Sequence, residues 1–355
     1  MMANLFARAG VLFGGMGVLL LVLLSGGNHA PTNNTIPIVT AMVESLEDGQ
    51  CPNPVCIAGL QLTDPITGAI DTFRVGGLHP EAFYYSPDYS KIGFLQGERW
   101  HILDLETRRS RLVSNDVVSY NSRIFFDPRL MAWSPDSTHI AYNSRNGIAI
   151  VDVQTGEHHL VSHLNAQQSL QWSPDGTHLL FSANPANTLA NLDLYSLDLT
   201  TGELTNLTAN LPYSYDGIWS PDGSQIVFLM SGRSPIGPGD LFIMNADGTN
   251  LERLTYDQTE YKWRPRWILD NTAIFYWARD YFQLDLETGE LLRRDDNYKT
   301  LGQDISPDGS QFVQVQSIDY LAGDYLLTIY DFRTEESYDL PLKTYRATYP
   351  EWRSD

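Results

Sequence analysis

The chain is poor in cysteine and in basic residues, and both shortages exclude classes of protein. Only two of its 355 residues are cysteines, so the paired Cys-x-x-Cys motifs that hold zinc do not occur. Lysine and arginine number 23 against 43 acidic residues, which gives a formal net charge of −20. Nucleic-acid binding requires basic patches that neutralise phosphates. We therefore expect no nucleic-acid partner, and the acidity favours either solubility or a cationic partner.

Common catalytic and metal-binding patterns are also missing. No Gly-x-Ser-x-Gly nucleophile elbow occurs, since the stretch 232–236 lacks the second glycine. No His-Glu-x-x-His motif occurs either. Residues 245–250 look superficially like a calcium loop, but the rest of the ligand pattern and the closing glutamate are absent. We therefore predict no catalytic residue, no metal site and no cofactor.

One uncharged apolar run, residues 11–24, follows Arg8. Its length suits the central region of a secretory signal and is short for a membrane-spanning helix. We expect residues 1–30 to be a signal peptide or a retained membrane anchor, which places the protein in the periplasm or on the cell surface. Residues 31–54 are rich in Gly, Asn, Thr and Pro and are expected to form a linker, in which residues 39–46 could add a strand to the next domain.

The most informative pattern is a repeated sequence motif, Trp-Ser-Pro-Asp, which begins at Trp133, Trp172 and Trp219. Weaker copies lie at residues 85–88 and 305–309, and a degenerate copy begins at Trp267. When the copies are aligned on the serine position, they fall at 86, 134, 173, 220, 268 and 306, which are 38 to 48 residues apart. A fixed period of this length decides the architecture before any local propensity does.

Each repeat reads as four short strands joined by tight turns. Proline presets the backbone of the Ser-Pro-Asp-Gly turn, and its glycine suits the last position. Apolar runs such as 179–181 and 194–197 follow, then an Asp-x-x-Thr-Gly turn such as 152–156, then a short closing strand such as 204–208. Four-stranded units of this size are typical of β-propeller blades. We predict an all-β propeller over residues 55–355.

The pattern of Trp-Ser-Pro-Asp-Gly, an apolar strand, then Asp and Gly before a terminal Leu-Thr resembles the TolB-type repeat, a PD40 relative of WD40. The resemblance covers residues 86–355 and implies six blades and a role in protein–protein assembly in the cell envelope. Counting from the residues, six units are complete, 57–75 read as the last two strands of another, and the segment around Trp352 reads as a first strand. We therefore predict seven blades, closed by this composite blade, with six as the alternative.

The repeated residues of the motif are predicted to be structural. Because the tryptophans recur at one repeat position, we expect them to pack between blades: Trp133, Trp172, Trp219 and Trp267. For the same reason the repeated aspartates are expected to form turns: Asp136, Asp175, Asp222 and Asp308.

The connections that vary in length are predicted to form a binding face. Both tight turns of a repeat should lie on one face, so the variable connections gather on the other: 114–130, 183–192, 209–217, 230–240, 255–265 and 295–303. They are rich in aromatic residues and arginine, the usual anchors of interfaces. Any single ring could instead pack between blades, but the set favours binding. The predicted contact residues are Tyr120, Arg123, Phe125, Tyr213, Tyr215, Tyr256, Tyr261, Trp263 and Arg264.

Two functions follow from this sequence. The first is a non-enzymatic, extracytoplasmic scaffold that binds a protein or glycan partner in the cell envelope and meets the membrane only through an uncleaved N-terminal segment. The alternative is a propeller enzyme, such as a polysaccharide lyase or hydrolase, with a site at the channel mouth. Some lyases with TolB-like propellers hold a metal with histidines, and His101, His139 and His178 support that reading only weakly. His139 and His178 share a repeat position beside the turn, which favours a structural role.

We predict that Cys51 and Cys56 form a disulfide in the exported protein, because they are the only cysteines and lie in one short loop. Non-reducing mass spectrometry should find the protein two hydrogens lighter than after reduction. Loss of so short a loop should cost about 2 kcal/mol of unfolding free energy or less. Quantitative labelling of both thiols without reductant would contradict the pairing.

Overall fold

The computed structural model describes fourteen stretches of the chain: 38–44, 56–63, 70–74, 82–96, 99–117, 131–186, 191–232, 238–257, 261–268, 271–278, 280–294, 300–305, 311–319 and 324–342. Seven predicted features lie outside them: the signal or anchor segment, Cys51, Tyr120, Arg123, Phe125, Asp308 and the terminal Trp352 strand. In the described stretches, no helix has the length and apolar character needed to cross a membrane.

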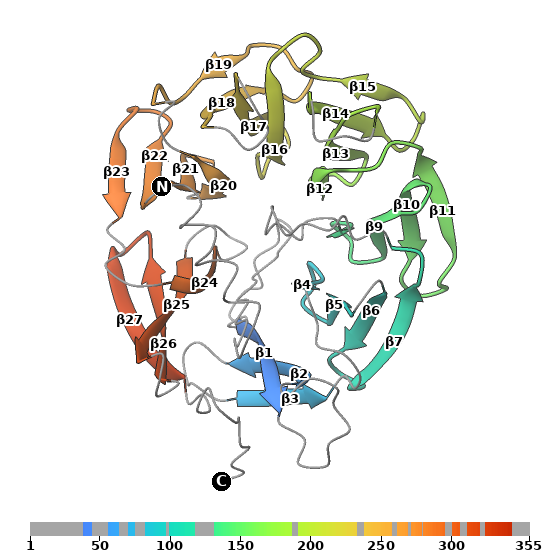
Figure 1. Ribbon diagram of the computed structural model, residues 1–355, viewed down its shortest axis with the longest axis vertical. Coiled ribbons are helices and arrows are strands. Elements are labelled where there is room, and N and C mark those ends of the chain that lie inside the picture. The colour runs from blue at the N-terminus through green and yellow to red at the C-terminus, as the bar shows by residue number, and fades with distance from the viewer. Residues whose placement is uncertain are drawn as a thin grey trace, which may run out of the picture.

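Six antiparallel four-stranded sheets stand around a central axis as the blades of a propeller (Figure 1). Blade 1 holds β4 (Ala82–Tyr85), β5 (Lys91–Leu95), β6 (Trp100–Asp104) and β7 (Arg109–Ser114). Blade 2 holds β8 (Met131–Trp133), β9 (His139–Ser144), β10 (Gly147–Asp152) and β11 (His158–Ser162). Blade 3 holds β12 (Gln168–Trp172), β13 (His178–Ala183), β14 (Asp193–Asp198) and β15 (Leu204–Asn206).

The remaining three blades continue the same order. Blade 4 holds β16 (Tyr213–Trp219), β17 (Gln225–Ser231), β18 (Asp240–Asn245) and β19 (Glu252–Arg253). Blade 5 holds β20 (Trp263–Ile268), β21 (Ala273–Trp277), β22 (Tyr281–Asp285) and β23 (Leu291–Arg294). Blade 6 holds β24 (Thr300–Ile305), β25 (Gln311–Asp319), β26 (Asp324–Asp331) and β27 (Glu336–Leu342). The first strand of each blade lies nearest the axis and the fourth lies on the outside (Figure 1).

A seventh sheet differs from the blades, because it has three strands: β1 (Ile38–Glu44), β2 (Cys56–Thr63) and β3 (Ile70–Arg74). It stands between blade 1 and blade 6 (Figure 1). β2 and β3 confirm the two strands expected in residues 57–75. β1 corresponds to the strand expected within residues 39–46 of the linker, and it pairs antiparallel with β2. Its Ile and Val residues favour an extended backbone. The described residues therefore hold six four-stranded blades, which was the alternative count, and the prediction of seven such blades is corrected.

The Ser-Pro-Asp turns are closed by the same hydrogen bonds in blade after blade. In blade 4, Ser220 Oγ donates to Asp222 Oδ1 at 2.6 Å, and the backbone N–H of Ser224 donates to the same oxygen at 3.0 Å. The buried Ser220 Oγ also accepts from the N–H of Gln225 at 2.9 Å. These bonds from Ser220 and Ser224 hold the pKa of Asp222 below its usual value. The repeated aspartates in the described turns are turn formers, as predicted, and blades 1, 2 and 3 show the same bonds.

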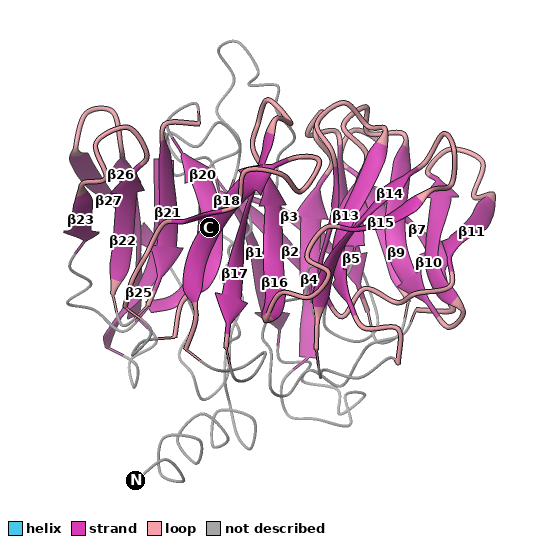
Figure 2. Ribbon diagram, turned by 90° about the horizontal axis from the view of Figure 1, so that it is seen from above, coloured by secondary structure: helices cyan, strands magenta, loops and turns pink. Residues whose placement is uncertain are grey.

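The second tight turn uses an aspartate in the same way in blades 1, 2, 3, 5 and 6, whereas blade 4 has Asn245 at that position. Asp198 Oδ1 accepts from the backbone N–H of Thr200 at 2.7 Å and of Thr201 at 3.0 Å. Gly202 then takes a φ of 76°, which favours glycine. Because the strands alternate in direction, both turns lie at one end of every blade, which we call the short-turn face. The other connections lie at the opposite end, the long-loop face, and Figure 2 shows the ring edge-on between these faces.

Arg108 links the three-stranded sheet to blade 1. It occupies the turn position that glycine holds in blades 2, 3 and 5, with a φ of 57°. Its guanidinium makes two bonds to the carboxylate of Asp71 in β3, at 2.9 and 3.0 Å, and lies 4.2 Å from the ring centroid of Phe73. A planar guanidinium matches a carboxylate in this bidentate way, whereas lysine does not. Arg108 thus adopts an unfavourable positive φ at the position from which its side chain joins blade 1 to the three-stranded sheet.

The core lies between neighbouring blades, and the motif tryptophans connect them there. Leu180 and Leu194 of blade 3, for example, pack with Ile226 and Phe228 of blade 4. In three of the four motif tryptophans, the indole N–H donates to a backbone carbonyl in the first strand of the preceding blade. The donor–acceptor pairs are Trp133 to Tyr84 at 3.2 Å, Trp172 to Ala132 at 3.0 Å and Trp267 to Ile218 at 3.5 Å. The predicted position between blades is confirmed.

Replacing Trp172 by phenylalanine should lower the unfolding free energy by about 1 kcal/mol more than the same change at Trp219. Both side chains are half-buried, but Trp172 Nε1 donates to the preceding blade, whereas Trp219 Nε1 is buried without a partner among the described residues. Trp219→Phe therefore removes ring volume and no hydrogen bond. Chemical denaturation of the two variants measures the difference, and equal losses would show that the N–H bond contributes nothing.

Candidate functional site

The predicted binding residues that the structure describes come from blades 4 and 5. Tyr213 begins β16 and Trp263 begins β20, and first strands run from the long-loop face to the short-turn face. Tyr256 and Tyr261 lie in the connection between the two blades. The structure therefore brings together one part of the predicted binding face.

These residues differ sharply in exposure. Tyr256 is 77% exposed and Tyr261 is 42% exposed, while Tyr213, Trp263 and Arg264 are half-buried. Tyr215 is only 3% exposed and packs in the core with apolar residues of blades 4 and 5. Burial, and secondarily the charge of Asp216, raise the pKa of the Tyr215 phenol. The structure thus places Tyr215 in the core and Tyr256 and Tyr261 on the surface.

Three aromatic side chains gather at the long-loop end of blade 5. The rings of Tyr261 and Trp263 stack with centroids 6.1 Å apart and an interplanar angle of 11°. Trp277, which is 36% exposed, lies directly opposite Trp263 in the ladder between β20 and β21. Opposite residues of an antiparallel pair place their side chains on the same face of the sheet. Sequence reasoning missed Trp277, although its place at the end of a second strand would have put it on this face.

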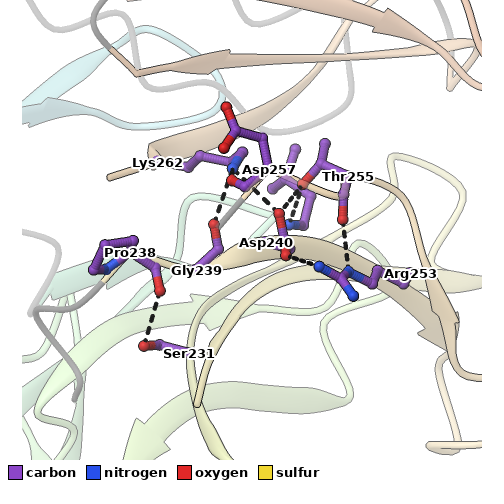
Figure 3. A network of polar contacts seen from close by, with 9 residues as sticks. Ser231, Pro238, Gly239, Asp240, Arg253, Thr255, Asp257 and Lys262 are labelled. Atoms are coloured by element: carbon purple, nitrogen blue, oxygen red, sulfur yellow. Dashed lines mark hydrogen bonds and ion pairs between the residues drawn. The ribbon is translucent and has the colours of Figure 1, made fainter. Parts of the chain in front are cut away.

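A buried carboxylate, that of Asp240, lies among Arg253, Thr255 and Lys262 (Figure 3). Asp240 begins β18 and is fully buried. Its Oδ1 accepts from Thr255 Oγ1 at 2.9 Å and from Lys262 Nζ at 3.2 Å, and its Oδ2 pairs with the guanidinium of Arg253. The carboxylate is therefore compensated by two cations and a hydroxyl, as a buried charge must be.

Lys262 uses its ammonium to join two connections of the long-loop face. The side chain is 4% exposed, and Nζ donates to the carbonyl of Gly239 at 3.1 Å and to the carbonyl of Asp257. Gly239 precedes β18, whereas Asp257 belongs to the connection that leads to blade 5. All three donors of the ammonium are thus used, two of them on backbone carbonyls of different loops. These contacts hold Thr255, Asp257 and Lys262 against blade 4.

A comparison with blade 3 shows which part of this network belongs to the repeat. Thr208 Oγ1 accepts from the N–H of Leu194 at 2.9 Å and donates to Asp193 at 3.5 Å. Thr255 makes the same pair of contacts, accepting from Leu241 at 3.0 Å and donating to Asp240. Blade 3, however, has Asn206 where blade 4 has Arg253, and its aspartate is half-buried. Blade 3 thus lacks both cations, because the repeat position of Lys262 is occupied by Ser214 in the chain segment that follows blade 3.

Arg253 also connects the buried carboxylate to the most exposed ring. Its Cζ lies 4.8 Å from the centroid of Tyr256, and its Nε donates to the carbonyl of Thr255 at 2.8 Å. A guanidinium over an aromatic face is an attractive cation–π contact. Tyr256 is therefore held on one side by Arg253 while most of its surface faces solvent.

The histidines that supported the enzyme alternative do not gather at a site. His139 Nδ1 lies 2.7 Å from Thr138 Oγ1, and His178 Nδ1 lies 2.7 Å from Thr177 Oγ1, each beside its own short turn. His101 stacks on Phe94 with ring centroids 5.2 Å apart. In the described part of the chain, no three His, Cys, Asp or Glu residues are placed to hold a metal ion.

The blades and their tight turns define a β-propeller of antiparallel, Asp-turned repeats. The family model of the TolB beta propeller domain (PD40) matches residues 104–353, which is more than half of the chain. The chain therefore belongs to the TolB β-propeller family, as its resemblance suggested. No curated protein matches the sequence significantly.

Solved structures with similar folds carry different names. Oligogalacturonate lyase from Vibrio parahaemolyticus is 18% identical, with a TM-score of 0.57 over 79% of this chain and 83% of that chain. Dipeptidyl peptidase 4 from Porphyromonas gingivalis is 11% identical, with a TM-score of 0.54 over 93% and 60% of the two chains. TolB from Acinetobacter baumannii is 18% identical, with a TM-score of 0.49 over 86% and 79%. At these identities the likeness concerns the fold alone.

Replacing Lys262 by methionine should destabilise the domain by about 3 kcal/mol, because the buried Asp240 loses one of its two cations and two backbone carbonyls lose their donor. Adding Asp240→Asn to this variant should recover part of the loss, since no carboxylate then remains buried. Denaturant midpoints of the single and double variants measure both effects. A Lys262→Met protein that unfolds at the wild-type midpoint would contradict the assigned role.

Proposed function

We propose that this protein is a non-enzymatic binding scaffold whose long-loop face recognises a protein or glycan partner at blades 4 and 5. The observation that carries the proposal is the exposed ring of Tyr261, which stacks on the half-buried Trp263 and lies next to Lys262 of the buried Asp240 network. Exposed aromatic side chains are strongly enriched among the residues that dominate binding energies.

The anchoring of this connection supports binding through its effect on entropy. A loop that must become ordered on association loses conformational freedom and therefore affinity. Lys262 already joins the connection to blade 4, and Tyr261 already rests on Trp263. Rigid aromatic rings on a fixed backbone contribute contact area at low entropic cost. This part of the face is thus preorganised for a partner.

The proposed setting is outside the cytoplasm, in the periplasm or at the cell surface. The apolar run at residues 11–24 is the motivation, together with two cysteines that suit an oxidising compartment. The envelope partner of such a scaffold would meet the long-loop face. The membrane would be contacted only by an N-terminal segment that is retained.

The enzyme alternative has less support. Its best argument is the fold likeness to a lyase, and propellers of one fold host many unrelated activities. Its three histidines serve short turns or stack on a neighbouring ring. No described group of side chains offers it a metal site.

Replacing Tyr261 and Trp263 together by alanine should weaken partner binding about thirtyfold, which corresponds to the roughly 2 kcal/mol that an aromatic anchor contributes. The matched control is Tyr338→Ala, which removes a ring of similar exposure, 39%, from the outer strand β27. Wild type and variants are compared on a glycan array and on an envelope-protein extract, and each captured ligand is then titrated.

Comparison with the Tyr338→Ala control shows whether a loss of binding is specific to Tyr261 and Trp263. A ligand that binds wild type and Tyr338→Ala equally, and the double variant weakly, supports the site. If the double variant binds every captured ligand as tightly as wild type does, the site assignment is wrong. Circular dichroism and melting curves establish that the double variant is folded.

A further inference from the structure

Three neighbouring side-chain amides at the start of blade 3 are buried, and four of their polar atoms have no hydrogen-bond partner among the described residues. Asn165, Gln167 and Gln168 are 8%, 9% and 7% exposed. Asn165 Oδ1, Gln168 Oε1 and both polar atoms of the Gln167 amide make no hydrogen bond in the part of the chain that the structure describes. Buried polar groups in proteins are nearly always paired, so four unpaired amide atoms within four residues require an explanation.

The backbone around these amides is, by contrast, well held. Asn143 accepts from the N–H of Ala166 at 2.9 Å and donates to the carbonyl of the same residue. The N–H of Gln167 donates to the carbonyl of Ser182 at 2.8 Å. The segment is thus fixed to blades 2 and 3 through its main chain, while its amide side chains are left unmatched.

The repeat provides an internal comparison for Gln167, which lies five residues before the motif tryptophan of blade 3. The same position is Ser214 in blade 4 and Lys262 in blade 5. Ser214 Oγ donates to the carbonyl of Pro212 at 2.8 Å, and Lys262 binds Asp240 and two carbonyls. This repeat position therefore satisfies its polar group in both following blades but not in blade 3. The unmatched amide is not a requirement of the fold.

The amides lie near the inner side of the ring. β12 is the first strand of its blade and lies nearest the axis (Figure 1). It begins at Gln168 and runs away from the long-loop face. The three amides therefore stand at the long-loop end of the innermost strand of blade 3, one to two blades away from Tyr261 and Trp263.

We propose that these amides form a binding site for a neutral, hydroxyl-rich ligand, that is, a carbohydrate. The unpaired atoms include three carbonyl oxygens and one amino group. A hydroxyl both donates and accepts, so sugar hydroxyls match such a set. The polar side chains in contact with the segment or its strand, Asn143, Ser169 and Ser182, are uncharged. An ion would therefore lose its hydration there without gaining a counter-charge.

Binding requires that the glutamine side chains change rotamer, because their amide atoms are covered in the free protein. Glutamine has three rotatable side-chain bonds, and the backbone bonds described above need not change. The site goes beyond the proposed function: it uses blades 2 and 3, takes a defined class of small ligand, and does not involve the aromatic residues of blade 5.

The test replaces both glutamines, Gln167→Leu and Gln168→Leu, in the full chain. The probes are glucose, galactose, N-acetylglucosamine and their unbranched oligomers, with N-acetyl-trialanine amide as a peptide probe. Isothermal titration and saturation-transfer NMR measure binding, and calorimetry measures the melting temperature. We expect wild type to bind at least one saccharide, and the double variant to bind it at least tenfold more weakly.

Stability separates a ligand site from a structural role. Removing unmatched buried amides should raise the melting temperature, by about 2 °C or more, because leucine leaves no polar group unpaired. A lower melting temperature together with no saccharide binding by wild type would mean that the amides serve the fold, through ordered water for example, and would overturn the proposal. Binding of the peptide probe instead of any saccharide would also overturn it.

The control distinguishes this site from the aromatic one. The Tyr261→Ala, Trp263→Ala protein should bind the saccharide as wild type does, because its amides are intact. If that variant loses saccharide binding and the leucine variant keeps it, the carbohydrate belongs to blade 5 and the amide site is refuted. Failure of the amide site alone leaves the proposed function of the aromatic residues unaffected.

Discussion

The architecture depends on the contact between each motif tryptophan and the blade before it. A four-stranded sheet cannot bury both of its faces alone, so every blade needs its neighbours for a core. The indole ring supplies apolar surface for that core. In blades 2, 3 and 5 its N–H also donates to a carbonyl in the first strand of the preceding blade. The Ser-Pro-Asp turn directly follows the tryptophan in the sequence. The hydrogen bonds of this turn therefore also fix the position of the tryptophan that joins the two blades.

Repetition makes departures from the pattern interpretable. In blades 3 and 4 a threonine accepts the N–H of the second residue of the third strand and donates to the aspartate that begins this strand. In blade 4 two cations, Arg253 and Lys262, also bind this aspartate and hold the adjoining connection. Blade 3 has an unpaired amide at a repeat position where blades 4 and 5 have paired groups. Such differences between equivalent positions are not required by the architecture, and they therefore point to function.

The two proposed sites on the long-loop face have opposite physical characters. At blades 4 and 5, the exposed ring of Tyr261 lies next to Lys262, which pairs with a buried carboxylate. At blade 3, buried amide atoms are unpaired among the described residues, while Asn143 and Ser182 bind the backbone of Ala166 and Gln167. The aromatic site is preorganised to offer contact area. The amide atoms of blade 3 are covered, so they can bind a ligand only after a change of side-chain rotamer. The short-turn face, in contrast, is built from aspartates that satisfy their own turns.

The sequence alone determined the blade, because a period of 38 to 48 residues and local turn chemistry depend only on neighbours in the chain. It also identified the structural tryptophans and aspartates, since residues at one repeat position share one environment. Only the tertiary structure decided how the N-terminal strands join the ring, because that sheet forms from segments whose pairing is not periodic. It alone separated the buried Tyr215 from the exposed Tyr261, and found Trp277, Asp240 and Lys262. Burial and pairing at these positions depend on contacts between connections, and no repeat pattern encodes them.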